Sequence, residues 1–199
     1  MSTRTGYNIT DQHAPYFVTF TAVGWVDIFS RKACKEIIVD ALRYCIKHKG
    51  LILYAYVIME SHLHLIVGAR EGSTGLSAII RDFKRHTSKA IIKWTAPSNY
   101  KESRRTWLRI VFEYHAKFNK RNQRFQVWQQ RSHPIILHSP KFTWQKLNYI
   151  HNNPVKAGIV DEAAAFCYSS ARNYAARFDF VLPVSIIDFG FTEGFVLVD

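Results

Sequence analysis

The chain predicts an α+β fold, because segments with strand periodicity and segments with helical periodicity alternate along it. Three observations carry this prediction: an alternating apolar segment near residue 16, two amphipathic helical patterns, and a pair of apolar strands between those patterns. Their order is strand, helix, hairpin, helix, strand, which is the order of a split βαβ, ferredoxin-like sheet. We therefore expect an antiparallel sheet with helices on one face.

The first half of the chain supplies the first strand, the first helix and the hairpin. Phenylalanine and threonine alternate within residues 16–23, as in a strand with one buried face. Ser30 is placed to cap a helix with three-four apolar spacing, and Gly50 is placed to end it. Residues 51–59 are almost all apolar and predict a central strand, which the polar pair Glu60-Ser61 separates from its hairpin partner.

The second half supplies the remaining helices and the last strand. Apolar residues recur with helical spacing over residues 76–94 and about 102–118, and residues 134–137 suit a fourth strand. A final helix follows. We expect Pro154 to end it just after Asn153, because proline has no N–H to donate and biases the preceding residue out of the helical region.

We expect one domain over residues 1–175, with a basic helical insertion at about 97–127, followed by an apolar tail over residues 176–199. A chain of 199 residues that is 48% hydrophobic suits a single core of this size. No apolar run approaches the length of a membrane span, and the first residues lack the apolar core of a signal peptide. The sequence therefore predicts a cytoplasmic protein with no membrane partner.

Basic residues are concentrated in one part of the chain. The formal net charge is +12, from 27 basic and 15 acidic residues, and the excess gathers between Arg81 and Arg131. Such a segment favours a polyanionic partner, because neutralising phosphates releases counterions; the alternative is a solvated basic face without a ligand. The candidate contacts to a DNA backbone are Arg81, Lys84, Arg85, Lys89, Arg104, Arg105, Lys120, Arg121, Arg124 and Arg131.

His62 and His64 are candidate metal ligands. Residues 62–67 alternate, so the leucines point to one face of the strand and both histidines to the other. Two neutral imidazoles that project in parallel can bind a metal ion. A hairpin strand that merely carries two histidines on its solvent face would give the same pattern.

Tyr149 is a candidate nucleophile on the final helix. Gln145, Tyr149 and Asn153 are four residues apart and share a polar face, away from the apolar side that holds Leu147 and Ile150. An ordinary amphipathic helix with its tyrosine hydroxyl in water fits the same spacing.

The two motifs together are more specific than either one alone. His62-Leu63-His64, followed by the run Tyr149-Ile150-His151-Asn152-Asn153-Pro154-Val155-Lys156-Ala157-Gly158, resembles the HUH single-tyrosine transposases, most closely their REP-associated branch. Weaker matches stand in order at residues 16–20, 83–88 and 127–129, so the resemblance covers roughly residues 16–174. Glu60-Ser61 departs from the Pro-Asn of many relatives.

This resemblance implies an HUH endonuclease-type fold, with Tyr149 as the catalytic residue and His62, His64 and Asn153 as ligands of Mg²⁺ or Mn²⁺. Imidazole and oxygen donors by themselves leave zinc open as well. The implied activity is DNA transposition, in which single-stranded or hairpin DNA is cut and rejoined through a 5′-phosphotyrosine intermediate. The resemblance also makes a homodimer a possible assembly, because related enzymes include dimers.

Two other functions fit the sequence and stay open. One is a non-catalytic DNA-binding regulator derived from a transposase. The other is a metal-dependent nuclease in which a bound water, rather than tyrosine, attacks the phosphate.

Overall fold

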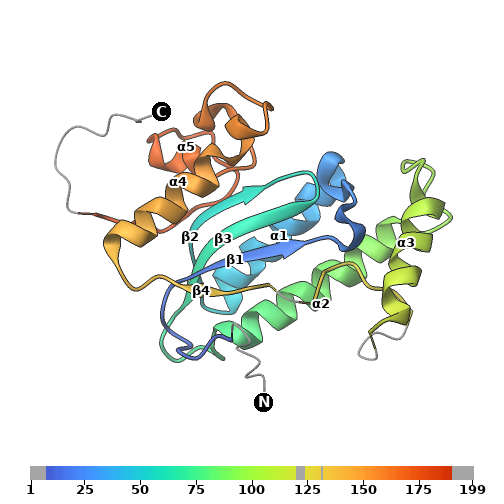
Figure 1. The fold of residues 1–199 in the computed structure, drawn as a ribbon, viewed down its shortest axis with the longest axis horizontal. Helices are drawn as coiled ribbons and strands as arrows, with labels where there is room; N and C mark the ends of the chain where they lie inside the picture. Colours follow the sequence, from blue (N-terminus) through green and yellow to red (C-terminus); the bar gives the residue numbers. More distant parts are fainter. Residues whose placement is uncertain (1–7, 120–123, 131, 190–199) are drawn as a thin grey trace, which may run out of the picture.

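The computed structural model describes residues 8–119, 124–130 and 132–189. In chain order, its main elements are β1 (Tyr16–Thr21), α1 (Lys32–His48), β2 (Leu51–Ile58), β3 (His62–Ala69), α2 (Leu76–Trp94), α3 (Arg105–Lys117), β4 (Ile135–Ile136) and α4 (Pro140–Lys156). Short helices η1 (Val23–Trp25) and η2 (Ile28–Ser30) connect β1 to α1, and η3 (Ala163–Ala165) and α5 (Ala171–Tyr174) follow α4. Within the described residues the strands form an antiparallel sheet in the order β2-β3-β1-β4 (Figure 1), which confirms the split βαβ prediction.

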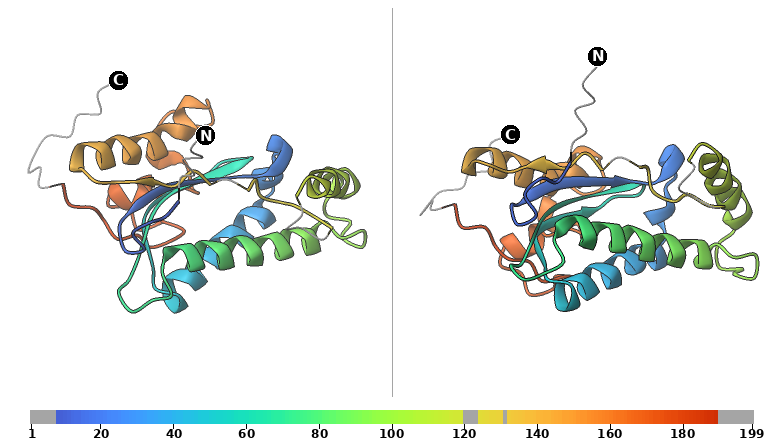
Figure 2. Two further views of the ribbon diagram at one scale, coloured as in Figure 1. Left: turned by 60° about the horizontal axis from the view of Figure 1, so that its bottom comes forward. Right: turned by 90° about the horizontal axis from the view of Figure 1, so that it is seen from below.

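The sheet is covered on both faces. Helices α1 and α2 lie side by side under one face, and α4 lies over the other (Figure 2). The first core contains Val18 and Leu65, and the core beneath α4 contains Phe17, Ile66 and Ile150. The expectation of helices on one face therefore holds for α1 and α2, while α4 adds a second layer. Among the described helices, none combines the length and the hydrophobicity needed to cross a bilayer.

Helix α1 begins differently from the sequence prediction and ends as predicted. Its N-cap residue is Arg31, without a side-chain cap, and Ser30 instead accepts a hydrogen bond at 3.3 Å from the guanidinium of Arg104. The prediction of a Ser30 cap was wrong because Ser30 is the last residue of η2 and the helix begins after Arg31. Gly50 follows the helix with a φ of +74°, a left-handed conformation that glycine adopts readily.

Helix α4 continues through Pro154, so the prediction that this proline ends the helix was wrong. A proline in the last turn removes one N–H donor, and the turn still closes, because Ala157 N–H donates to the carbonyl of Asn153 at 3.0 Å. Gly158, with a φ of +67°, follows the helix end in the left-handed conformation. At the other end, Ser139 caps α4 by accepting from the N–H of Phe142.

The C-terminal segment covers the edge strand β2. Ser185 N–H donates to the carbonyl of Leu53 at 2.8 Å, and the side chain of Leu182 is fully buried. The described part of the apolar tail, residues 176–189, therefore packs on its own domain. It also gives a hydrogen-bond partner to the Leu53 carbonyl, which would be unpaired at a free sheet edge.

Helix α3 extends beyond one end of the sheet (Figure 1) and is tied to the core by a buried carboxylate. Glu102 accepts hydrogen bonds from Arg104 N–H at 2.9 Å and Arg104 Nε at 3.1 Å, and Arg31 Nε lies 3.4 Å from its second oxygen. Arg104 also pairs with Asp27 at 2.6 Å. Burial acts to raise the pKa of Glu102, but the hydrogen bonds and charge of Arg104 outweigh it and lower the pKa.

This network predicts that Glu102→Ala destabilises the protein by about 2 kcal/mol, because it removes a buried acceptor and leaves partly buried donors of Arg104 without that partner. Glu113→Ala is the matched control: it removes an exposed ion pair with Arg124 and should cost less than about 0.5 kcal/mol. Urea denaturation of the two variants measures both values. Equal losses would contradict the assignment of Glu102 to the anchoring of α3.

Candidate active site

The two histidines lie on the α4 side of the sheet. Strand β3 pairs with β1 in a register that puts Thr19 opposite His64. Leu63 and Leu65 point into the core under α1 and α2, so the predicted alternation is confirmed. The imidazole centroids of His62 and His64 are 4.8 Å apart, with their planes at 73°.

His64 is buried and oriented by a hydroxyl group. Its ring stacks on Phe17 at 5.4 Å, and its Nδ1 lies 2.8 Å from the hydroxyl oxygen of Thr19. Burial, together with the nearby His62 and Lys146, lowers the pKa of His64 to about 3, so the ring is neutral at pH 7. When Nδ1 carries the proton and donates to Thr19, Nε2 presents its lone pair.

His62 lies nearer the surface. Its Nδ1 is 3.1 Å from the hydroxyl of Ser61, and the exposed indole of Trp25 meets its ring edge to face at 5.6 Å. Burial lowers the pKa of His62 as well. Both imidazoles are therefore in the neutral form, which is the form that binds metal ions.

Tyr149 faces the histidines from α4. Its hydroxyl oxygen lies 3.5 Å from His64 Nε2, and the two rings are 5.1 Å apart. Tyr149 is 41% exposed, so the residue borders solvent. Leu147 and Ile150 are buried beneath the helix, which confirms that Tyr149 points away from the apolar side of α4.

His151 belongs to the same sequence motif, but it anchors α4 instead of joining the site. Its Nε2 lies 2.9 Å from Ser170 Oγ. The same oxygen accepts a hydrogen bond from the N–H of Tyr56 on β2 at 3.0 Å. Burial lowers the pKa of His151 to about 4, so its nitrogen can accept the serine proton at neutral pH. One serine hydroxyl thus joins the helix that carries Tyr149 to the sheet that carries the histidines.

Lys146 brings a positive charge to the site and was not among the predicted site residues. Its Nζ lies 5.1 Å from the ring centre of Phe17 and 5.9 Å from that of Tyr149. The sequence signal for it is its position three residues before Tyr149, since residues three apart are neighbours on a helix. It lies outside the basic segment on which the charge prediction rested.

Asn153 lies one turn beyond Tyr149 on α4 and is partly exposed. No group of three or more His, Cys, Asp or Glu side chains that could hold a metal occurs in the described part of the chain. The candidate ligands that the sequence predicted here are two imidazoles and, as the resemblance implies, one amide oxygen. Such a set suits an ion whose other positions are filled by water or phosphate oxygens.

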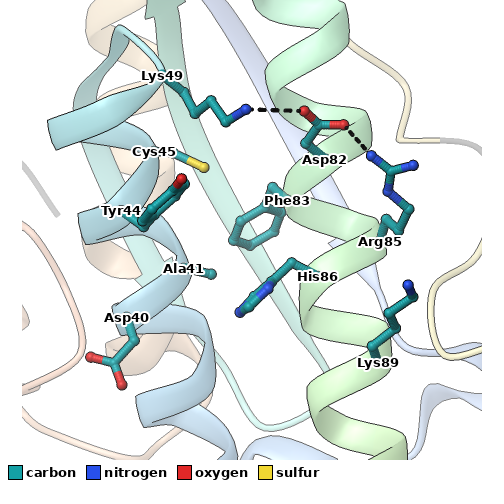
Figure 3. Close-up of a pocket in the computed structure, with 10 residues that line it drawn as sticks. All are labelled: Asp40, Ala41, Tyr44, Cys45, Lys49, Asp82, Phe83, Arg85, His86 and Lys89. Carbon is teal, nitrogen blue, oxygen red and sulfur yellow. Dashed lines mark hydrogen bonds and ion pairs between the residues drawn. The ribbon is translucent and has the colours of Figure 1, made fainter.

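Several predicted DNA contacts lie on the opposite side of the sheet from Tyr149. Arg81 and Arg85 both pair with Asp82, at 3.3 Å and 2.9 Å. Arg85 and Lys89 line a groove of about 610 Å³ between α1 and α2 (Figure 3). Because α1 and α2 cover the face away from α4, the structure does not bring these residues to the histidines.

Lys84 also has a partner within the protein. Its Nζ donates to the carbonyl of Gln129 at 2.8 Å, and burial lowers its pKa to about 8. A phosphate contact would have to compete with that hydrogen bond.

The predicted contacts around α3 are also partly engaged. Arg104 is held by Asp27 and Glu102, so its guanidinium serves the α3 anchor described above. Arg105 donates to two backbone carbonyls at 3.0 Å, and Arg124 forms an exposed pair with Glu113. Lys120, Arg121 and Arg131 lie outside the described residues.

Comparison with known proteins supports the fold. No protein-family model and no curated protein matches the chain. Among solved structures, the chain is similar to a REP-associated tyrosine transposase bound to a REP hairpin, with a TM-score of 0.56 and 19% identity over 98% of this chain and 99% of that one. The two proteins thus share a fold over nearly their whole length.

Burial of His151 predicts that the protein loses stability in mild acid. Because its pKa falls from 6.5 to about 4 on folding, the unfolded chain binds the proton first as the pH drops below 6.5. The free energy of unfolding is therefore highest above pH 6.5 and decreases as the pH falls toward 4. His151 accounts for about 3 kcal/mol of this decrease.

Urea denaturation at pH 7 and pH 4.5, in EDTA, tests this expectation. His151→Gln should reduce the difference in unfolding free energy between the two pH values by about 2 kcal/mol. His86→Gln, at an exposed position on α2, should leave the difference unchanged. An undiminished pH difference in His151→Gln would contradict the expectation.

Proposed function

We propose that this protein is an HUH single-tyrosine transposase that cuts and rejoins single-stranded DNA through a 5′-phosphotyrosine bond to Tyr149. The observation that carries the proposal is the 3.5 Å approach of the Tyr149 hydroxyl to His64, beside His62. The shared fold supports the proposal, and the REP hairpin bound by the similar transposase favours hairpin DNA with a single-stranded flank as the substrate.

The residues present suit a divalent metal. His62 and His64 are neutral and adjacent, and the Thr19 hydroxyl orients His64. Asn153, one helical turn beyond Tyr149, is the third ligand that the resemblance implies. Held by these residues, Mg²⁺ or Mn²⁺ would supply positive charge to a non-bridging oxygen of the scissile phosphate. Lys146 contributes a further positive charge from the protein itself, close to the ring of Tyr149.

The reaction exchanges one phosphate ester for another. The Tyr149 oxygen forms a bond to phosphorus as the bond to the 3′-oxygen breaks; the tyrosine proton is released and the departing oxygen takes one up. Because the ester energy stays in the phosphotyrosine, a second 3′-hydroxyl can reverse the step and join strands without ATP. A tyrosine has an ordinary pKa of about 10, so the charge gathered around the phosphate is what makes the attack feasible near neutral pH.

A denaturing gel tests this proposal directly. DNA hairpins with single-stranded flanks, taken from beside the protein's own gene and labelled at the 3′ end, are incubated with the protein and Mg²⁺ or Mn²⁺. We expect a labelled, protein-sized adduct that EDTA, Tyr149→Phe and His64→Ala each abolish. Tyr44→Phe, an exposed tyrosine on α1, is the control and should keep the adduct.

Two other results would replace the proposal. Cutting without an adduct that survives Tyr149→Phe would identify a water nucleophile. Tight binding without cutting of any strand would identify a DNA-binding regulator.

The Thr19 hydroxyl gives a separate prediction about the metal. Thr19→Val keeps the branched shape but removes the partner of His64 Nδ1, and we expect Mn²⁺ affinity to fall about 10- to 100-fold. Titration calorimetry on the Tyr149→Phe protein measures it. Thr21→Val, opposite His62 on the same strand, is the control and should keep the Mn²⁺ affinity of the parent protein. If Thr19→Val binds Mn²⁺ as tightly as the parent, packing alone orients His64.

A further inference from the structure

Trp25 is a large apolar side chain placed in solvent beside the candidate active site. Trp25 is 62% exposed, and its indole meets the ring of His62 at 5.6 Å. Ring contacts continue from His62 to His64 at 4.8 Å and from His64 to Tyr149 at 5.1 Å. Trp25 thus stands at the end of a series of aromatic contacts that begins at the proposed nucleophile.

The backbone at this position is also unusual. Gly24 and Trp25 have φ values of +62° and +54°, and the second is a strained conformation for a bulky residue. Such conformations persist where the surrounding structure imposes them, and they gather at functional sites. Because most of the indole stays in water, burial compensates little of the strain.

The surrounding structure holds the turn from two sides. Ala22 N–H donates to the carbonyl of Ser61 at 2.9 Å, which ties the turn to the start of β3. On the other side, a Cβ on Gly24 would lie 3.3 Å from both His115 Nε2 and Val111 Cγ1, so α3 packs directly against the turn. The turn that carries the indole is therefore held between the start of β3 and α3.

We propose that Trp25 is a stacking platform for an unpaired base next to the scissile phosphate. This inference rests on the proposed DNA substrate and adds a binding site to it. A phosphate held at His62 and His64 places a neighbouring nucleotide within reach of the indole, because the ring of Trp25 contacts that of His62. A base in a duplex has both faces covered by its neighbours, so the platform favours single-stranded over paired DNA.

The chemistry of the position favours a nucleic-acid base over a protein partner. The exposed indole beside His62 offers a surface the size of one base, whereas a stable protein interface buries about 800 Å² on each side. The chain also carries a net charge of +12, which attracts phosphates. Stacking accepts every base, so Trp25 contributes affinity without reading sequence.

Binding measurements in the Tyr149→Phe protein test the proposal without any dependence on cutting. Fluorescence anisotropy with labelled hairpins that carry single-stranded flanks gives the dissociation constant. We expect Trp25→Ala to weaken binding roughly 5- to 150-fold, the range for loss of one stacked base, and Trp25→Phe to lose less than about 5-fold. Tyr44→Ala removes an aromatic of similar exposure on α1 and should bind like the parent.

Abasic substitutions then locate the base. Single abasic sites are moved along the flank, and at one position the parent and Trp25→Ala should bind equally, because the stacked base is gone from both complexes. Unchanged thermal melting of Trp25→Ala shows that any loss is not unfolding.

The outcomes separate this proposal from the proposed function. Equal affinities of the parent and Trp25→Ala on all flanks, or the same loss with every abasic oligonucleotide, would overturn the stacking platform and leave the nicking proposal intact. The expected pattern combined with a gel that shows no cutting would retain the platform and overturn the nicking activity. If no oligonucleotide binds, both are overturned.

Discussion

The candidate site depends on the antiparallel pairing of β3 with β1. That register sets Thr19 beside His64 and turns both histidines toward α4, while Leu63 and Leu65 fill the opposite core. A slip of one residue would exchange the two sets, placing imidazoles in the apolar layer and leucines in the site. The two cores thus enforce the register that the site requires, and the stability of the sheet and the geometry of the site have a common origin.

The candidate nucleophile, Tyr149, is positioned by a helix and not by the sheet. Tyr149 is on a helix that packs over the sheet through Leu147 and Ile150, and a single hydroxyl, Ser170, links that helix to β2. Residues 169–170 come long after the strand they contact, so the C-terminal part of the chain completes the support for the tyrosine. The motif residue His151 therefore serves the position of Tyr149.

The sequence allowed the fold to be predicted well because its periodicities are local. Alternation in β3 and the spacing of Leu147, Tyr149 and Ile150 both describe which side of an element faces apolar neighbours, and the structure follows them. Contacts between distant residues were beyond that reasoning. We predicted Arg104 and Lys84 as DNA contacts from their charge. In the structure, Arg104 forms an ion pair with Glu102, and Lys84 donates to the carbonyl of Gln129. Trp25 was missed because nothing in the local pattern shows that a turn holds its indole in solvent.

Only residues 137–139 separate β4 from α4, and this short connection limits where α4 can place Tyr149. The helix leaves the sheet edge and returns at once over the same sheet, so Tyr149 and the histidines of one chain come together. A reaction through Tyr149 in this arrangement would be first order in protein, with a rate per molecule that dilution leaves unchanged.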